Sequence, residues 1–238
     1  MATPDNQTTI VTYAVLAGLT PLIPVPYVDD VALRYFKRHM VRSVANSHDS
    51  RLSEDQVRTL IDDASSGGFV SGVVGSAVKY PLKKVFRKVF YFLEWKRAVD
   101  TASRTYYQGF LIDHALAEGW CKPVGDKPLP EVRSAVDKVL TKTDTRPIER
   151  TIAATFQGFK GMLGDAALYV GRKLSAQTAK GDDAEQTLSE LERQEGHKLS
   201  RVVDQLKGAI SAMPAEHFAG LRKGLAAELG GADPQNRA

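Results

Sequence analysis

The amino-acid sequence predicts an all-α protein, a multi-helix bundle that a Pro/Gly linker joins to a second helical region. Apolar residues recur with helical spacing along most of the chain, and residues that start or stop helices separate these stretches. The 238 residues, of which 43% are hydrophobic, are enough to bury a core. We expect an N-terminal helical domain over residues 9–118, a linker over 119–130, a C-terminal helical region over 131–230 and a disordered tail over 232–238.

The longest apolar run covers residues 10–28, carries no charge and is long enough to cross a membrane. Three prolines lie in its second half, and proline removes a backbone donor and interrupts a helix. We therefore predict a helix over 9–19 followed by an extended elbow, and we favour a buried core helix over an intramembrane segment. A second uncharged run, 64–78, has four glycines and is short for a membrane span; a closely packed helix and a buried strand both fit it.

Local signals place the other helices of the first half. Asp29 or Asp30 is the predicted N-cap of a helix that ends near residue 46. The capping box Ser53–Gln56 opens the next helix. Pro81 lies in the first turn of a third helix, whose pattern continues to Leu116.

The second half has the pattern of helices throughout. The predicted helices cover 131–140, 147–174, 182–213 and a final stretch from Pro214 to Gly230. Glycines 158, 161, 164 and 171 interrupt the second of these, each at a cost of about 1 kcal/mol relative to alanine. We interpret them as sites of close packing against a neighbour. For the apolar seam of 182–213, we favour packing onto the 147–174 helix over self-association.

Residues 79–97 combine positive charge with aromatic side chains. This segment contains seven lysines or arginines, one acidic residue and six aromatic residues, whereas the net charge of the whole chain is only +4. Such a helix suits a membrane interface, where each basic residue near anionic lipid contributes about 1 kcal/mol. A solvated basic face with its aromatics in the core, and binding to nucleic-acid phosphates, are the alternatives. The predicted membrane- or anion-binding residues are Lys79, Lys83, Lys84, Phe86, Arg87, Lys88, Phe90, Trp95, Lys96 and Arg97.

The sequence offers little catalytic chemistry. It has no phosphate-binding loop, no HExxH motif and no nucleophile elbow, and its one cysteine, Cys121, excludes an intrachain disulfide. Asp113 and His114 are the one local pair that resembles acid–base machinery, but a structural contact of Asp113 with Arg104 or a distant base is favoured. We therefore predict no catalytic residue, no metal site and no cofactor, and expect that the protein is not an enzyme.

One stretch of the chain resembles a known family. The run LAGLTPLIPVPYVDDVALRYF, with Pro24, Pro26 and Asp29, is similar to the YcjF-like domain-of-unknown-function family, in which a hydrophobic helix meets a Pro-x-Pro elbow and an Asp opens the next helix. The stretch GFVSGVVGSAV resembles that family's second hydrophobic region, so that the resemblance covers about residues 10–95. It implies association with a membrane and a small GTPase as partner.

These observations lead to one leading hypothesis. We expect a non-enzymatic helical scaffold or adaptor, peripheral or monotopic, on the cytoplasmic face of an anionic membrane, with a protein partner or a second copy of itself. The N-terminus lacks the basic stretch of a secretory signal, which favours the cytoplasm. The alternative is a soluble helical interaction protein whose basic face binds an acidic protein or nucleic acid, and an enzyme with a site near Asp113 is the third.

Overall fold

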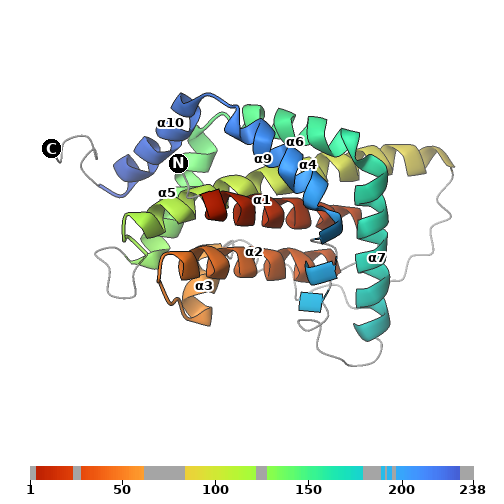
Figure 1. Cartoon of the computed structure of the whole chain (residues 1–238), viewed down its shortest axis with the longest axis horizontal. Coiled ribbons are helices and arrows are strands. Elements are labelled where there is room, and N and C mark those ends of the chain that lie inside the picture. The colour runs from red at the N-terminus through yellow and green to blue at the C-terminus, as the bar shows by residue number, and fades with distance from the viewer. Residues whose placement is uncertain are drawn as a thin grey trace.

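The computed structural model of the protein describes residues 4–23, 28–61, 84–121, 128–178, 189–190, 192–194 and 197–230. This part of the chain contains helices and no strand, so the predicted all-α class is confirmed (Figure 1). The elements are α1 Pro4–Leu19, the 3-10 helix η1 Thr20–Leu22, α2 Val28–Ser47, α3 Glu54–Ile61, α4 Lys84–Ala117, α5 Leu129–Lys142, α6 Arg146–Gly158, α7 Lys160–Thr178, α9 Ser200–Ser211 and α10 Ala215–Glu228. The uncharged run 64–78 and the tail 232–238 lie outside the described residues.

Helix α1 occupies the centre of the bundle. It packs against α4, α2 and α9, and in Figure 1 it runs between α2 and α4. Val11, Ala14 and Val15 are fully buried, as expected for a helix that is apolar nearly all round. The prediction of a core helix in the first uncharged run is thus confirmed, although the helix begins at Pro4, where a proline fits the first turn.

The helices of the two predicted regions share one hydrophobic core. Buried side chains of α1, α2 and α4 form a continuous cluster with those of α5, α6, α9 and α10. Helix α6 packs on α4, and α9 packs on both α1 and α6. The segment 119–130, predicted as a linker between domains, therefore connects elements of a single core.

Two predicted helix ends have the geometry that their residues indicated. The Gln56 backbone N–H donates to Ser53 Oγ (3.3 Å), and the Ser53 N–H donates to Gln56 Oε1 (2.8 Å), which is the reciprocal pattern of a capping box. After α10, Gly230 has a φ of +65°, the left-handed conformation that glycine adopts without a Cβ penalty.

The prediction of one helix over 147–174 is wrong. Helix α6 ends at Gly158 and α7 begins at Lys160, because Phe159 between them has non-helical backbone angles of −115° and 20°. The turn sends α7 across the ends of α1 and α2, as Figure 1 shows, and α7 contacts both of them. A continuous apolar stripe concealed this break, because the residues on both sides of it face the same core.

Close packing does not explain the glycines near this break. A methyl group added at Gly158, Gly161 or Gly164 would meet no heavy atom within 4 Å. The tight helix contacts occur at two other glycines, Gly18 of α1 and Gly109 of α4, where an added methyl carbon would lie 2.9 and 2.8 Å from its nearest neighbour. The interpretation of the three α6–α7 glycines as packing sites is therefore wrong.

The apolar seam predicted in 182–213 is partly described by α9. Its residues Leu199, Val202, Leu206 and Ile210 are buried, and α9 packs against α6, as favoured, and also against α1. Leu188 and Leu191 lie outside the described residues. The described part of the seam is covered within the chain, so it offers no surface for self-association.

Candidate membrane-binding arm and polar clusters

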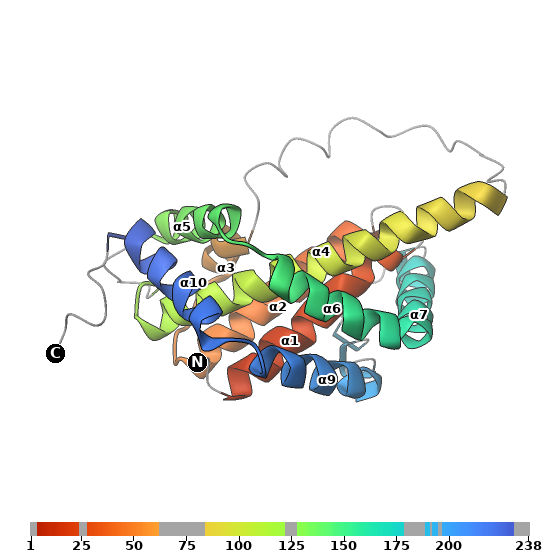
Figure 2. The same cartoon turned by 90° about the horizontal axis from the view of Figure 1, so that it is seen from above.

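The first ten residues of α4, 84–93, extend beyond the bundle and are called the arm below. Figures 1 and 2 both show this yellow end of α4 passing beyond α7, while the rest of the helix crosses the bundle. At the end of the arm, Leu93 is 50% exposed. Next to it, Lys96 and Arg97 are also exposed, and Arg97 pairs with Glu94 at 3.3 Å. The predicted helix is thus present from Lys84 onward, and its first turns project outward.

Trp95 lies where the arm joins the bundle. Its side chain is 9% exposed and belongs to the hydrophobic core, and the Lys160 ammonium stands 5.3 Å from the ring centroid. This cation–π contact ties α4 to the start of α7. Trp95, predicted as a membrane-contacting aromatic, is placed in the core instead, where it holds the base of the arm.

The other predicted contact residues divide between described and undescribed parts of the chain. Lys79 and Lys83 lie outside the described residues. On the helical backbone of the arm lie Lys84, Phe86, Arg87, Lys88 and Phe90. Spacings of three and four residues place positions 84, 87 and 88 on one side of the helix, and positions 86 and 90 are likewise one turn apart.

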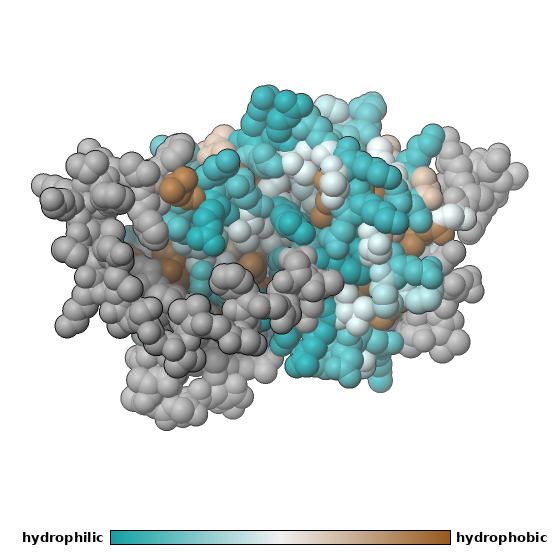
Figure 3. All heavy atoms as spheres, turned by 180° about the vertical axis from the view of Figure 1, so that it is seen from behind, coloured by the Kyte–Doolittle hydropathy of each residue, from teal (hydrophilic) through white to brown (hydrophobic). Residues whose placement is uncertain are grey.

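Elsewhere the visible surface is mostly polar. Figure 3, which shows the back of the molecule, is dominated by hydrophilic residues with small separate hydrophobic spots among the coloured atoms. The large apolar residues exposed in the described chain are Val31, Leu93 and Leu168, and single apolar residues of this kind are normal on a protein surface. Among the described helices, none has the length and apolar character needed to cross a membrane.

Asp113 is the centre of a buried polar cluster. The Asn6 Nδ2 donates to Asp113 Oδ1 at 2.7 Å, and His48 Nε2 lies 2.8 Å from the same oxygen. Asp113 is 5% exposed, and a carboxylate in such a position needs partners of this kind. The cluster joins α1, the turn after α2, and α4. The expected distant base is therefore His48; neither it nor Asn6 carries a local sequence signal for this contact.

The adjacent His114 and the suggested partner Arg104 belong to other contacts. The His114 ring packs edge-on against Trp120 at 5.6 Å, and Arg104 lies 4.0 Å from Asp137. Asp113 and His114 therefore do not form a reactive pair, and the Arg104 alternative for Asp113 is wrong. The cluster of Asp113, Asn6 and His48 is a structural contact, which is the interpretation that we favoured from the sequence.

Two histidines make folding stability sensitive to acid. Burial lowers the pKa of His114 and of His217, whose Nε2 lies 2.9 Å from the Tyr107 hydroxyl. Since the unfolded chain then takes up protons first, their contribution is complete above the unfolded pKa of about 6.5 and is lost as the pH falls. We expect the free energy of unfolding, measured with urea between neutral pH and pH of about 5, to decrease with acidity.

The double variant His114→Gln/His217→Gln should reduce this pH dependence. The exposed His197 provides the matched control, because His197→Gln also removes one histidine but at a position on the surface. An unchanged slope in the double variant, or an equal change in the control, would contradict the assignment to the buried pair.

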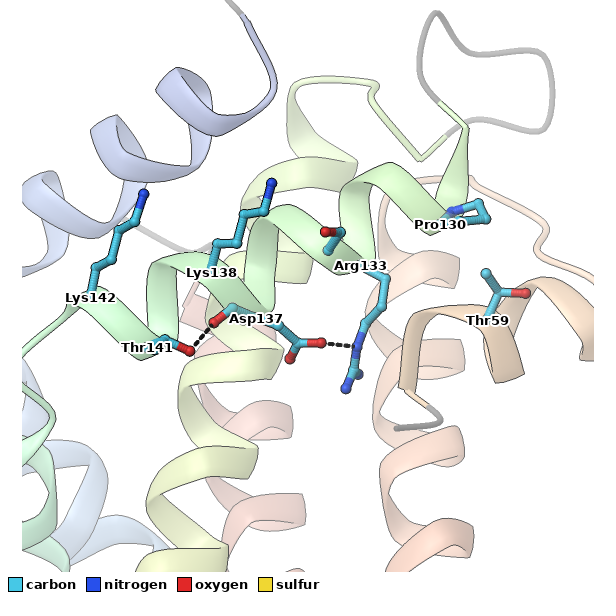
Figure 4. Close-up of a pocket in the computed structure, with 8 residues that line it drawn as sticks. Thr59, Pro130, Arg133, Asp137, Lys138, Thr141 and Lys142 are labelled. Carbon is cyan, nitrogen blue, oxygen red and sulfur yellow. Dashed lines mark hydrogen bonds and ion pairs between the residues drawn. The ribbon is translucent and has the colours of Figure 1, made fainter. Parts of the chain in front are cut away.

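Helices α3 and α5 border a hollow of about 540 Å³ (Figure 4). Its cations are already matched by carboxylates: Arg133 Nε donates to Asp137 Oδ2 at 2.7 Å, while Lys138 and Lys142 pair with Glu228 of α10. Arg133 also donates to the Leu60 carbonyl at 2.7 Å. The hydrogen bond from Lys142 holds the pKa of Glu228 below its ordinary value. This network ties α5 to α3 and α10, so we assign it a structural role.

Neither a metal cluster nor a reactive thiol emerges from the described residues. Within them no group of three or more His, Cys, Asp or Glu side chains could hold a metal ion. Cys121 is fully buried, and burial raises the pKa of its thiol to about 12. At neutral pH the thiol is protonated and therefore a poor nucleophile.

Comparison with known proteins adds no assignment to this geometry. No protein-family model matches the chain, and no curated protein and no solved structure is significantly similar to it. The resemblance to the YcjF-like family therefore rests on the quoted residues alone. The function has to be argued from the arm and from the surfaces around it.

Proposed function

We propose that this protein is a non-enzymatic, membrane-associated helical scaffold or adaptor that docks on anionic lipid through the arm. The observation that carries the proposal is the projection of the arm beyond the bundle (Figure 2). A helix end that projects beyond its own core can meet another surface. The YcjF-like resemblance suggests a small GTPase as the partner of such a scaffold.

Charge and sequence pattern favour a lipid surface. Within the arm, Lys84, Arg87 and Lys88 alternate with aromatic and aliphatic residues and no acid, the composition of interfacial helices. Each cation near anionic lipid contributes about 1 kcal/mol, so a few of them with inserted aromatics support reversible docking. The buried Trp95 anchors the base of the arm and so fixes its direction relative to the bundle.

Neutralising the arm should abolish docking. We expect the variant Lys83→Gln/Lys84→Gln/Arg87→Gln/Lys88→Gln to lose cosedimentation with phosphatidylserine vesicles that the parent protein shows, because it loses four attractive charges. Salt should weaken parent binding, since exposed charges are screened beyond about 10 Å at 0.1 M salt.

The matched control removes four exposed cations from the rest of the surface: Arg150→Gln, Arg172→Gln, Lys173→Gln and Arg201→Gln. Both variants have the same net charge, so only the position of the charges differs. Equal loss in the two variants, or no vesicle binding by the parent, would refute the arm as the docking element. Parent binding to nucleic acid in place of vesicles would favour the alternative of a soluble interaction protein.

A further inference from the structure

A cavity of about 320 Å³ lies on the side of Asp137 that faces α4. It is bordered by α4, α5, the connection between α5 and α6, and the first turn of α6. Its size is at the lower end of the range for small-molecule sites. The polar groups that the argument uses are Asp100, Ser103, Tyr107, Thr145 and Glu149.

Ser103 is a buried polar group without a partner in this cavity. The residue is 2% exposed, yet its hydroxyl oxygen forms no hydrogen bond. A buried hydroxyl left in this state keeps its desolvation cost without a compensating hydrogen bond, and such groups call for an explanation in a folded protein. A bound molecule with a hydrogen-bonding group at this point would remove that cost.

The charges around the cavity are predominantly negative. Asp137 is balanced by Arg133 at 2.7 Å and by Arg104, a cavity residue, at 4.0 Å. Asp100 and Glu149 form no ion pair with any described residue. Burial raises the pKa of Asp100 above its ordinary value; Lys96 one turn away lowers it by a smaller amount, and the nearby Glu149 adds a still smaller increase. A cation that lies near two carboxylates stabilises their charged forms.

We propose that this cavity binds a small organic ammonium ion, with Asp100 and Glu149 attracting the charge and the Ser103 hydroxyl accepting an N–H. The cavity is negative on a chain whose net charge is +4, so the local field selects cations that the rest of the surface repels. The Tyr107 hydroxyl lies 2.9 Å from His217 Nε2, whereas the Ser103 hydroxyl, like Asp137 Oδ1, forms no hydrogen bond. This site is separate from the arm and does not depend on membrane docking.

Putrescine, a short diamine, is the ligand for the test, measured by isothermal titration calorimetry with the full chain at low salt. We expect binding to the parent and about tenfold weaker binding to Asp100→Asn/Glu149→Gln, since two partly exposed ion pairs contribute about 0.7 kcal/mol each. The charge-matched control is Asp165→Asn/Asp204→Asn, which alters two exposed carboxylates of α7 and α9. The diol of the same chain length controls for the charge of the ligand.

Ser103→Ala separates binding from folding. Because the hydroxyl forms no hydrogen bond in the free protein, its loss should leave thermal stability unchanged or slightly raised, while putrescine binding weakens several-fold. Absence of putrescine binding to the parent at millimolar concentration would overturn the proposal. So would equal binding of the diol, equal weakening in the control variant, or undiminished binding by Ser103→Ala.

Discussion

Asp113→Ala should lower the free energy of unfolding by about 3 kcal/mol, because it leaves the buried Asn6 amide and the partly buried His48 ring without their shared acceptor. Asn6 and His48 lie 2.7 and 2.8 Å from the same Asp113 oxygen, and the three residues come from parts of the chain that meet only in the folded state. Urea denaturation at neutral pH measures the change. For a chain of this length the corresponding fall in Tm is roughly 10 °C.

Asp113→Asn distinguishes loss of the acceptor from loss of the negative charge. An amide oxygen still accepts from Asn6 but carries no charge toward His48, so we expect an intermediate loss of about 1–2 kcal/mol. Asp204→Ala, on the exposed face of α9, is the control and should stay within about 0.5 kcal/mol of the parent. If Asp113→Ala also stayed within that range, the cluster would have no part in stability.

Gly18→Ala should destabilise the protein by about 2 kcal/mol, although alanine is the better helix former. The new methyl carbon would lie 2.9 Å from Ala102 Cβ of α4 and 3.0 Å from two ring atoms of Phe156 of α6. Ala102 Cβ is attached directly to backbone and the Phe156 ring is fully buried, so neither neighbour can move away easily. Overpacking of this kind costs about 1–3 kcal/mol. Thermal and urea denaturation measure the result.

Gly109 and Gly161 provide a graded comparison. At Gly109 the added carbon would meet Met40 Sδ at 2.8 Å and Ile10 Cγ2 at 2.9 Å; methionine is flexible, so Gly109→Ala should cost less than Gly18→Ala. At Gly161 the space is open, and Gly161→Ala should stabilise by about 0.5–1 kcal/mol through helix propensity alone. The order Gly161, Gly109, Gly18 from most to least stable variant is the prediction, and a reversed order would contradict the packing argument.

Local signals in the sequence were sufficient for two helix ends, whereas α2 begins at Val28, so that Asp29 and Asp30 lie in its first turn and are not its N-cap. The capping box at Ser53 and Gln56 forms as predicted, and α10 stops before Gly230. These ends depend on residues within one turn of each other, so their physics is contained in the local sequence. The break at Phe159 was missed because the apolar stripe continues across it, and no proline marks the change of direction.

The candidate sites depended on information that no local pattern contains. The sequence indicated that Asp113 needs a partner, but which base approaches it is decided by how α1, α2 and α4 cross. Likewise, the projection of the arm beyond α7 and the contact of Trp95 with Lys160 at the start of α7 are decided by how the helices pack. The cavity near Ser103 draws its residues from α4, α5 and α6, and Asp100 and Glu149, its carboxylates outside ion pairs, are far apart in the chain.

The sequence by itself determined that the chain is helical, that its first apolar run becomes a core helix, and that its positive charge is concentrated in one stretch. Those properties follow from composition and periodicity, which act over a few turns. Only the tertiary structure decided which glycines pack closely against a neighbouring helix, which polar groups contact each other in the core, and which part of α4 extends beyond the bundle. These outcomes depend on contacts between residues distant in the chain, because packing selects one arrangement of helices from many with the same local preferences.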